Sequence, residues 1–188
     1  MNLEVEEERE DVLELKLEDA NEAIANSLRR AMMAKVPTLA TKEIHVTKNE
    51  SAMFNEMLAN RIGQIPLTIP KNIDEEDEVK LSLKKEGPTT VLGEDLQAAN
   101  DEVEAVNPET EIVDLKEGQG IELEGTAVLG KGKDHAKHQG GTIGYEKTGE
   151  GEFNFRIEST SGYSNKELFK EAVDLIQEEL DELEEEIA

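Results

Sequence analysis

Hydrophobic and charged residues alternate near the beginning of the chain, and this period of two is typical of a half-buried β-strand. The apolar positions are Val12, Leu13, Leu15 and Leu17. Residues 4–8 precede them and are a candidate partner in a hairpin. The pattern therefore predicts two paired strands before the first helix.

The period then changes to that of an amphipathic helix. Asp19 and Glu22 have the spacing of a capping box, which predicts a helix start at this point. The apolar residues that follow fall on one helical face: Ile24, Leu28, Ala31 and Met32. Since Pro37 disfavours helical geometry at the residue before it, the helix should end near Lys35.

Alternation returns in the middle of the chain and predicts a strand-rich region. Residues 39–47, 79–83, 89–92, 112–113, 121–129 and 153–157 read as strands. A short helix is expected at residues 51–62, where Gly63 fits the helix end. Residues 130–144 are rich in Gly, Lys and His and are expected to form a loop.

The longest helix is predicted at the end of the chain, from Asn165 to about residue 187. Ser164 and Glu167 form a second capping box before it. Its apolar face is broad and should be buried, either on its own sheet or across a dimer axis. The positions on this face are Leu168, Phe169, Ala172, Val173, Leu175, Ile176, Leu180, Leu183 and Ile187.

The charge of the chain narrows the range of partners. Its 188 residues include 45 acidic and 20 basic side chains, a formal charge of 20 − 45 = −25. Such a chain is not expected to bind nucleic acid or an anionic membrane directly, because both need basic surfaces. The same composition fits either a salt-rich cytoplasm or a partly disordered acidic protein, and the periodic apolar runs favour a folded one.

The cysteine count, the length of the apolar runs and the first ten residues set further expectations. The chain has no cysteine, which excludes disulfides and cysteine-bound metal clusters in this sequence. No apolar run approaches the length of a membrane span, and the first ten residues, MNLEVEEERE, do not resemble a signal peptide. We therefore expect a cytoplasmic protein without a cofactor.

Two candidate chemical sites lie between residues 125 and 138. The segment GTAVLGKG, which begins at Gly125, nearly matches a phosphate-binding loop, but Gly132 occupies the place of the required Ser or Thr. His135 and His138 could bind a metal, yet only His45 remains as a further histidine. A nucleotide- or metal-dependent enzyme built on this segment is thus the alternative to a non-catalytic protein.

Adjacent arginines on the first helix offer a different kind of site. Arg29 and Arg30 point about 100° apart, so at least one of them leaves the core direction. They are either solvated charges or anchors of a protein interface, where arginine is enriched. No set of catalytic residues stands out elsewhere, which favours binding over chemistry.

Three long segments resemble one known family, the D subunits of archaeal RNA polymerase and their bacterial alpha-subunit and eukaryotic third-largest-subunit relatives. The segments are NSLRRAMMAKVPTLA from Asn26, NESAMFNEMLANRIGQIPL from Asn49, and EIVDLKEGQGIELEGTAVLGKGKDHAK from Glu111. Their order and spacing are also similar to those of the family. The resemblance implies a non-catalytic subunit of this nucleotidyltransferase complex.

The resemblance implies an α+β fold in which a discontinuous alpha-like dimerisation domain, a sheet with two main helices, carries an inserted β-rich domain. The expected boundaries are 1–48 and 149–188 for the dimerisation domain and 49–148 for the insert. The implied partners are the small alpha-like subunit L in a heterodimer, the large catalytic subunits, and the small subunits N and P. A free-standing acidic homodimer is the other non-enzymatic alternative.

The resemblance also implies two sets of interface residues. The contact with the large subunits would use Asn26, Arg29, Arg30, Asn60, Arg61 and Gly63. The contact with L would use Leu28, Met32, Leu168, Ala172, Leu175, Ile176 and Leu183.

The chain departs from the family pattern in places. It has NRIGQIPL and HAKH where the family has HRLGLIPL and HAKW, so a contact that depends on the family's histidine is not expected at Asn60, and Gln64 replaces a leucine beside it. Many archaeal members carry an iron–sulfur cluster domain; without cysteine, this chain is expected to be a cluster-free form.

Overall fold

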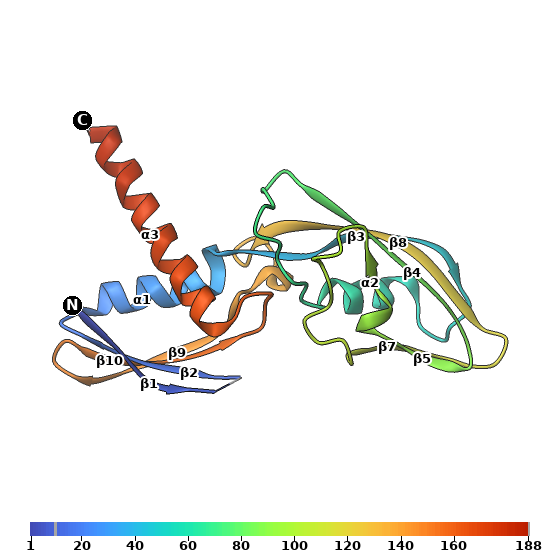
Figure 1. Cartoon of the computed structure of the whole chain (residues 1–188), viewed down its shortest axis with the longest axis horizontal. Helices are drawn as coiled ribbons and strands as arrows, with labels where there is room; N and C mark the ends of the chain where they lie inside the picture. Colours follow the sequence, from blue (N-terminus) through green and yellow to red (C-terminus); the bar gives the residue numbers. More distant parts are fainter. Residues whose placement is uncertain (10, 188) are drawn as a thin grey trace. The chain divides into compact units, whose positions relative to one another are not determined.

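The computed structural model describes residues 1–9 and 11–187, which form two compact units. The first combines Met1–Pro37 with Lys131–Ala188, and the second is the segment between them, Thr38–Gly130. Both contain strands and helices (Figure 1), so the fold is α+β with one unit inserted in the other. The expected boundary at residue 48 falls inside the strand Pro37–Asn49, and the expected boundary at residue 149 falls at the end of the strand Gly141–Gly149. Each of these strands belongs to a single sheet.

The first unit is built on a four-stranded antiparallel sheet in the order β1-β2-β10-β9. Its strands are β1 (Asn2–Glu8), β2 (Leu13–Glu18), β9 (Gly141–Gly149) and β10 (Glu152–Ser159). The predicted pairing of the first two strands is confirmed. Strand β9 begins inside the segment 130–144, which was predicted to be a loop. The prediction was wrong here because glycines and polar side chains conceal the alternation of buried and exposed positions around Ile143.

The first helix of this unit begins later than the capping-box prediction. Helix α1 (Glu22–Arg30) is capped by Asn21, whose side-chain oxygen accepts a hydrogen bond from the Ile24 amide at 3.0 Å. Asp19 instead has a positive φ of 54° and cannot serve as the cap. A π-helix, η1 (Ala31–Lys35), continues α1 and ends at Lys35 as predicted, since Pro37 follows.

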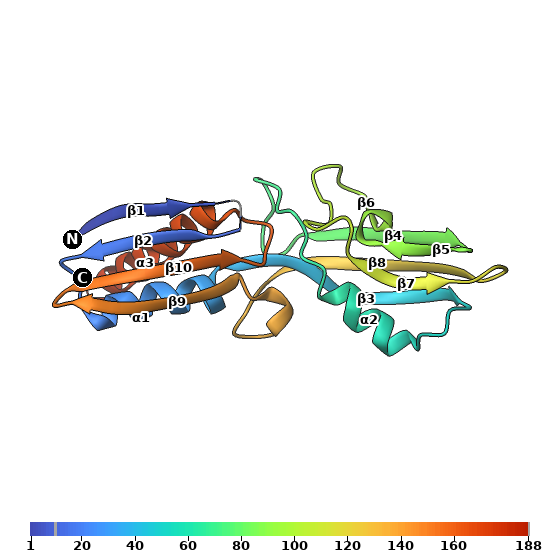
Figure 2. The same cartoon turned by 90° about the horizontal axis from the view of Figure 1, so that it is seen from below.

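The last helix, α3 (Asn165–Ile187), starts with the predicted capping box. The Ser164 amide donates to Glu167 Oε2 at 2.9 Å, and the Glu167 amide donates to Ser164 Oγ at 3.3 Å. Figure 2 shows α1 and α3 along one face of the sheet. The core between the sheet and these two helices contains Leu13, Leu15, Leu17, Ala25, Leu28, Ala31, Met32, Val36, Ile143, Phe153, Phe155, Ile157, Leu168 and Ala172.

The second unit combines a four-stranded sheet in the order β3-β8-β4-β6 with a two-stranded ribbon of β5 and β7. The strands are β3 (Pro37–Asn49), β4 (Glu78–Glu86), β5 (Thr89–Leu92), β6 (Gln97–Ala98), β7 (Glu111–Leu115) and β8 (Gly120–Lys131), with a short helix η2 (Gly93–Asp95) after β5. Each of the strands predicted here is present. The sequence pattern did not reveal β6, which has only two residues.

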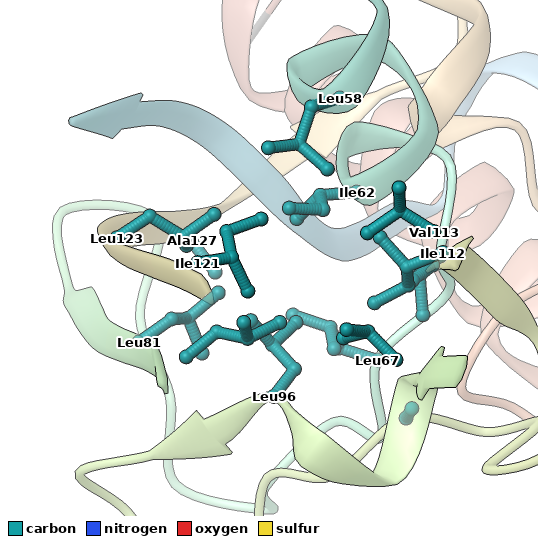
Figure 3. Close-up of a cluster of buried hydrophobic side chains, with 14 of the residues drawn as sticks. Leu58, Ile62, Leu67, Leu81, Leu96, Ile112, Val113, Ile121, Leu123 and Ala127 are labelled. Atoms are coloured by element: carbon teal, nitrogen blue, oxygen red, sulfur yellow. The ribbon is translucent and has the colours of Figure 1, made fainter. Parts of the chain in front are cut away.

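Helix α2 (Asn55–Gly63) ends at Gly63 as predicted but begins after residue 51. Asn49 and Ser51 form a turn instead, in which Asn49 Oδ1 accepts from the Ser51 hydroxyl at 2.6 Å and Ser51 Oγ accepts from the Met53 amide at 3.2 Å. Leu58 and Ile62 of α2 point into a core shared with Ile112, Val113 and Ile121 (Figure 3). This packing holds α2 against the strands of the second unit.

Candidate protein interaction site

An open apolar groove lies on the first unit, between α1, α3 and the edge strand β1. It has a volume of about 600 Å³. Ten of its thirteen lining residues are apolar. The lining residues are Met1, Asn2, Leu3, Leu17, Asn21, Ala23, Ile24, Ser27, Leu28, Phe169, Val173, Ile176 and Leu180.

The wall from α3 is a stripe of apolar residues at helical spacing. Phe169, Val173, Ile176 and Leu180 follow each other at intervals of three or four residues and therefore share one side of the helix. Leu180 is 56% exposed, and Leu183 and Ile187 continue the exposed apolar positions to the end of the helix. Exposed apolar stretches of this kind mark protein or ligand interaction sites.

The opposite wall comes from β1, an edge strand of the sheet. Leu3 pairs in register with Leu17, and Val5 with Leu15, so both lie on the helix-covered face. Yet Leu3 is 49% exposed, whereas Leu17 is buried. The two helices thus cover the centre of the sheet and leave its β1 edge open to a partner.

The structure divides the residues expected at the L interface into two groups. Leu28, Met32, Leu168 and Ala172 are buried in the core of the unit itself and present little surface to a partner. Leu175 and Ile176 are half-buried and Leu183 is exposed. Only this second group, with Leu28 in the groove wall, can contribute directly to a contact.

The far half of α3 is strongly acidic. Residues 178–186 contain seven carboxylates, and Lys170 is the last basic residue of the chain. Glu179 is paired with Lys35 of η1 at 2.6 Å, which ties the helix to the end of α1. The surroundings of the groove on this side are therefore negative.

The adjacent arginines have different environments. Arg29 is half-buried, and its guanidinium donates to Met33 Sδ at 3.2 Å and to Asn26 Oδ1 at 3.3 Å. Arg30 is exposed. The prediction that at least one of them leaves the core is confirmed, and Asn26 orients the other.

The remaining expected contact residues lie on α2 in the second unit. Asn60 and Arg61 are exposed, whereas Gly63 is buried. Arg61 donates to the Ile112 carbonyl oxygen at 2.9 Å and so connects α2 to β7. A hollow of about 380 Å³ with a mixed polar and apolar lining is formed by Asn60, Arg61, Gln64, Ile65, Pro66, Asn107, Thr110, Glu111 and Ile112.

The segment from Gly125 to His138 does not have the geometry of a phosphate-binding loop. Gly125 to Lys131 belong to strand β8, and only the three-residue helix η3 (Ala136–His138) follows. A phosphate site of that type needs backbone amides at the start of a longer helix. His138 is buried, and His135 Nδ1 accepts a hydrogen bond from the Lys137 amide at 3.2 Å.

Residues 1–9 and 11–187 contain no group of three or more His, Cys, Asp or Glu residues placed to hold a metal ion. None of their helices is long and apolar enough to cross a membrane.

An ion pair connects the start of α1 to β9. Lys147 of β9 donates to Glu22 Oε1 at 2.5 Å. This hydrogen bond lowers the pKa of Glu22 and raises the pKa of Lys147. The pair is exposed and adds little to stability.

Sequence reasoning missed several residues of the groove as site residues: Leu3, Ile24, Phe169, Val173 and Leu180. The α3 stripe was visible in the helical period, but the sequence could not tell which apolar side chains its own core covers. Two further exposed apolar residues lie at the start of α2: Phe54 is its N-cap residue, and Met57 is in its first turn.

Comparison with known proteins gives consistent matches. The family model described as "RNA polymerase Rpb3/RpoA insert domain" matches residues 42–145, more than half of the chain. A curated relative from Natronomonas pharaonis, "DNA-directed RNA polymerase subunit Rpo3", is 48% identical over 124 residues, 65% of this chain and 50% of the relative.

Relatives with the same name occur in other organisms. The protein of Pyrococcus furiosus is 39% identical over 153 residues, 78% of this chain and 59% of the relative. That of Methanocaldococcus jannaschii is 36% identical over 155 residues, 82% of this chain and 80% of the relative. The chain spans about half the length of the first curated relatives that it matches.

Proposed function

Because the chain belongs to the RNA polymerase Rpb3/RpoA family, we propose that it is the D-type subunit of a DNA-directed RNA polymerase, a non-catalytic platform for assembly. In this role it pairs with the small alpha-like subunit L and recruits the large catalytic subunits, with the small subunits N and P nearby. It works in the cytoplasm, without a cofactor of its own.

The observation that carries the proposal is the open groove of the first unit. A chain that folds alone would gain by covering Leu3, Val173 and Leu180, and their exposure leaves apolar surface available to a partner. Full burial of one leucine side chain contributes about 1.5–3 kcal/mol. Several such side chains in one groove are enough to hold a stable subunit pair.

The charge of α3 favours a different protein over a second copy of this chain. Two copies paired along α3 would bring the carboxylates of residues 178–186 close to each other, and like charges across an interface are unfavourable. A partner with basic residues beside its own apolar surface would avoid this repulsion. The heterodimer with L is therefore preferred to the homodimer.

Co-expression with L tests the pairing. Affinity purification of the tagged chain should retain L in a one-to-one ratio, and size-exclusion chromatography should give one shared peak. Two separate peaks under assembly conditions would contradict the heterodimer. A homodimer would appear as a peak of twice the chain mass of 20.9 kDa in the absence of L.

We propose that Arg30 and Arg29 recruit the large subunits. Arg30 is exposed at the end of α1, so Arg30→Ala should leave the pair with L intact while weakening pull-down of the second-largest subunit. Lys170→Ala is the control, since it removes an exposed positive charge from α3 instead. Equal recovery of the large subunit by the Arg30 variant and the unchanged chain would contradict this role.

A further inference from the structure

Positive charge is concentrated in two short segments of this acidic chain. Residues 29–35 and 131–139 contain six Lys or Arg side chains and a single acidic residue, Asp134. The whole chain, in contrast, has more than twice as many acidic as basic residues. The two segments lie far apart in the sequence, so their proximity has to come from the fold.

The fold holds the second segment directly on η1. The Lys133 amide donates to the Ala34 carbonyl oxygen at 3.0 Å. Gly132 lies so close that a Cβ there would be 2.4 Å from the Met33 carbonyl oxygen. At Gly140 the corresponding distance to the Met32 carbonyl oxygen is 2.2 Å. Both glycines are therefore needed for this close approach.

Both arginines lie on the helical turn just before the residues that make this contact. The guanidinium of Arg29 donates to Met33 Sδ, and Met33 is the residue that Gly132 approaches. Arg30 lies about one helical turn before Ala34, which accepts from Lys133. We call Arg29, Arg30 and Lys133 the basic surface.

The charges of the basic surface are not neutralised within the chain. Among the residues that the structure describes, Arg29, Arg30 and Lys133 have no ion-pair partner within 4 Å. Nearby Lys35 differs, because it is paired with Glu179. Arg29 is also held in place by Asn26 and Met33, so part of its conformational entropy is already lost before a partner binds.

We propose that the basic surface docks an acidic segment of a partner protein, with Lys133 as a contact residue alongside the two arginines. The inference rests on the proposed function, since it adds the loop at Lys133 to the large-subunit contact and specifies the chemistry of the partner segment. Carboxylates are the complementary groups, and arginine forms bidentate pairs with them.

An acidic protein segment is preferred to nucleic acid. A charge of −25 repels a phosphate backbone at long range, whereas a folded partner can place a few carboxylates on the surface and keep its other charges away. Three cations also fall short of the six to ten phosphate contacts typical of proteins that bind DNA strongly.

Zero-length cross-linking tests the contact directly. A carbodiimide joins a lysine amine to a carboxylate that touches it, and mass spectrometry identifies both peptides. We expect a Lys133 cross-link to an Asp or Glu of a large polymerase subunit in the reconstituted assembly. If the assembly forms and cross-links at other lysines but not at Lys133, the inference is overturned, whereas failure of the assembly itself would count against the proposed function.

Two variants separate charge from structure. Lys133→Arg keeps the charge and removes the amine, so assembly should persist while the cross-link disappears. Lys133→Glu should weaken association with the large subunit about tenfold at low salt, and the difference should shrink as salt is added. Lys71→Glu makes the same charge change at an exposed lysine of the other unit and should have little effect.

Binding to DNA is measured in parallel with a labelled duplex of 20 base pairs. We expect no binding by the unchanged chain and no change on Lys133→Glu. Duplex binding that depends on Lys133, with unchanged recruitment of the large subunit, would overturn the inference in favour of a nucleic-acid site.

Discussion

Replacement of Leu180 by glutamine should weaken the pairing with L while leaving the isolated chain folded. Leu180 lies on the apolar stripe of α3 and is 56% exposed, so it contributes little to the core of its own unit. Glutamine is also a good helix former, and the change adds no charge to an acidic helix. The free energy of unfolding of the isolated chain should therefore change by less than about 0.5 kcal/mol.

The cost to binding follows from the exposed fraction. Full burial of leucine contributes about 1.5–3 kcal/mol, and the exposed half that a partner can cover accounts for about 0.8–1.7 kcal/mol. A buried amide without hydrogen-bond partners adds a penalty of about 1–3 kcal/mol. The sum is about 2–5 kcal/mol, which corresponds to about 30- to 4,000-fold weaker binding.

Isothermal titration calorimetry with purified L measures the affinity, and urea denaturation measures the stability. Glu178→Gln is the matched control, because residue 178 is about 200° from residue 180 around the helix and is exposed. Leu168→Ala should instead destabilise the chain itself. This leucine is fully buried, so the free energy of unfolding should fall by about 2–5 kcal/mol. Unchanged affinity for L in the folded Leu180 variant would refute the assignment of the groove.

Three further predictions concern the chain alone. Gly140→Ala should lower the free energy of unfolding by at least about 2 kcal/mol, because the new Cβ would lie 2.2 Å from a backbone oxygen, whereas Gly144→Ala meets nothing within 4 Å and should change it by less than about 0.5 kcal/mol; equal urea midpoints would contradict this. Burial, with Glu171 and Glu167 nearby, raises the pKa of Tyr163 from 10.0 to about 12, so the folded state favours the protonated phenol. Its contribution to stability is complete below pH 10 and is lost as the pH rises from about 10 to 12; Tyr163→Phe should flatten this decline in urea titrations, and an unchanged slope would argue against it. The melting temperature should rise between 0.1 M and 1 M KCl, since the Debye length falls from about 10 Å to about 3 Å and screens the repulsion of 45 carboxylates; a lower melting temperature would show that the surface ion pairs outweigh this repulsion.

The hydrophobic pattern was enough to predict most of the strands and all three α-helices. The reason is local: alternation from Leu13 to Leu17 and the capping box at Ser164 are each encoded within a few residues. Strand β9 was not predicted, because Gly141 stands on its buried face where an apolar residue would reveal a strand. The cap at Asn21 was missed because Asp19 has the same chemistry two residues earlier.

The candidate site was harder to predict, because burial depends on contacts between distant segments. Leu168 and Leu180 occupy the same broad face of α3, yet one is in the core and the other lines the groove. The difference arises where the sheet and α1 end beneath the helix. In the same way, nothing local indicates that Lys133 lies on η1, since its amide donates to the Ala34 carbonyl oxygen across about 100 residues of sequence.

Hydrogen–deuterium exchange of the chain with and without L tests the central claim most directly. If L packs into the groove, amides of β1 and of the far half of α3 should exchange more slowly in the complex, because partner burial suppresses local opening. The amides of α2 in the other unit should keep their rates. A stable complex in which β1 and α3 show no added protection would contradict the account.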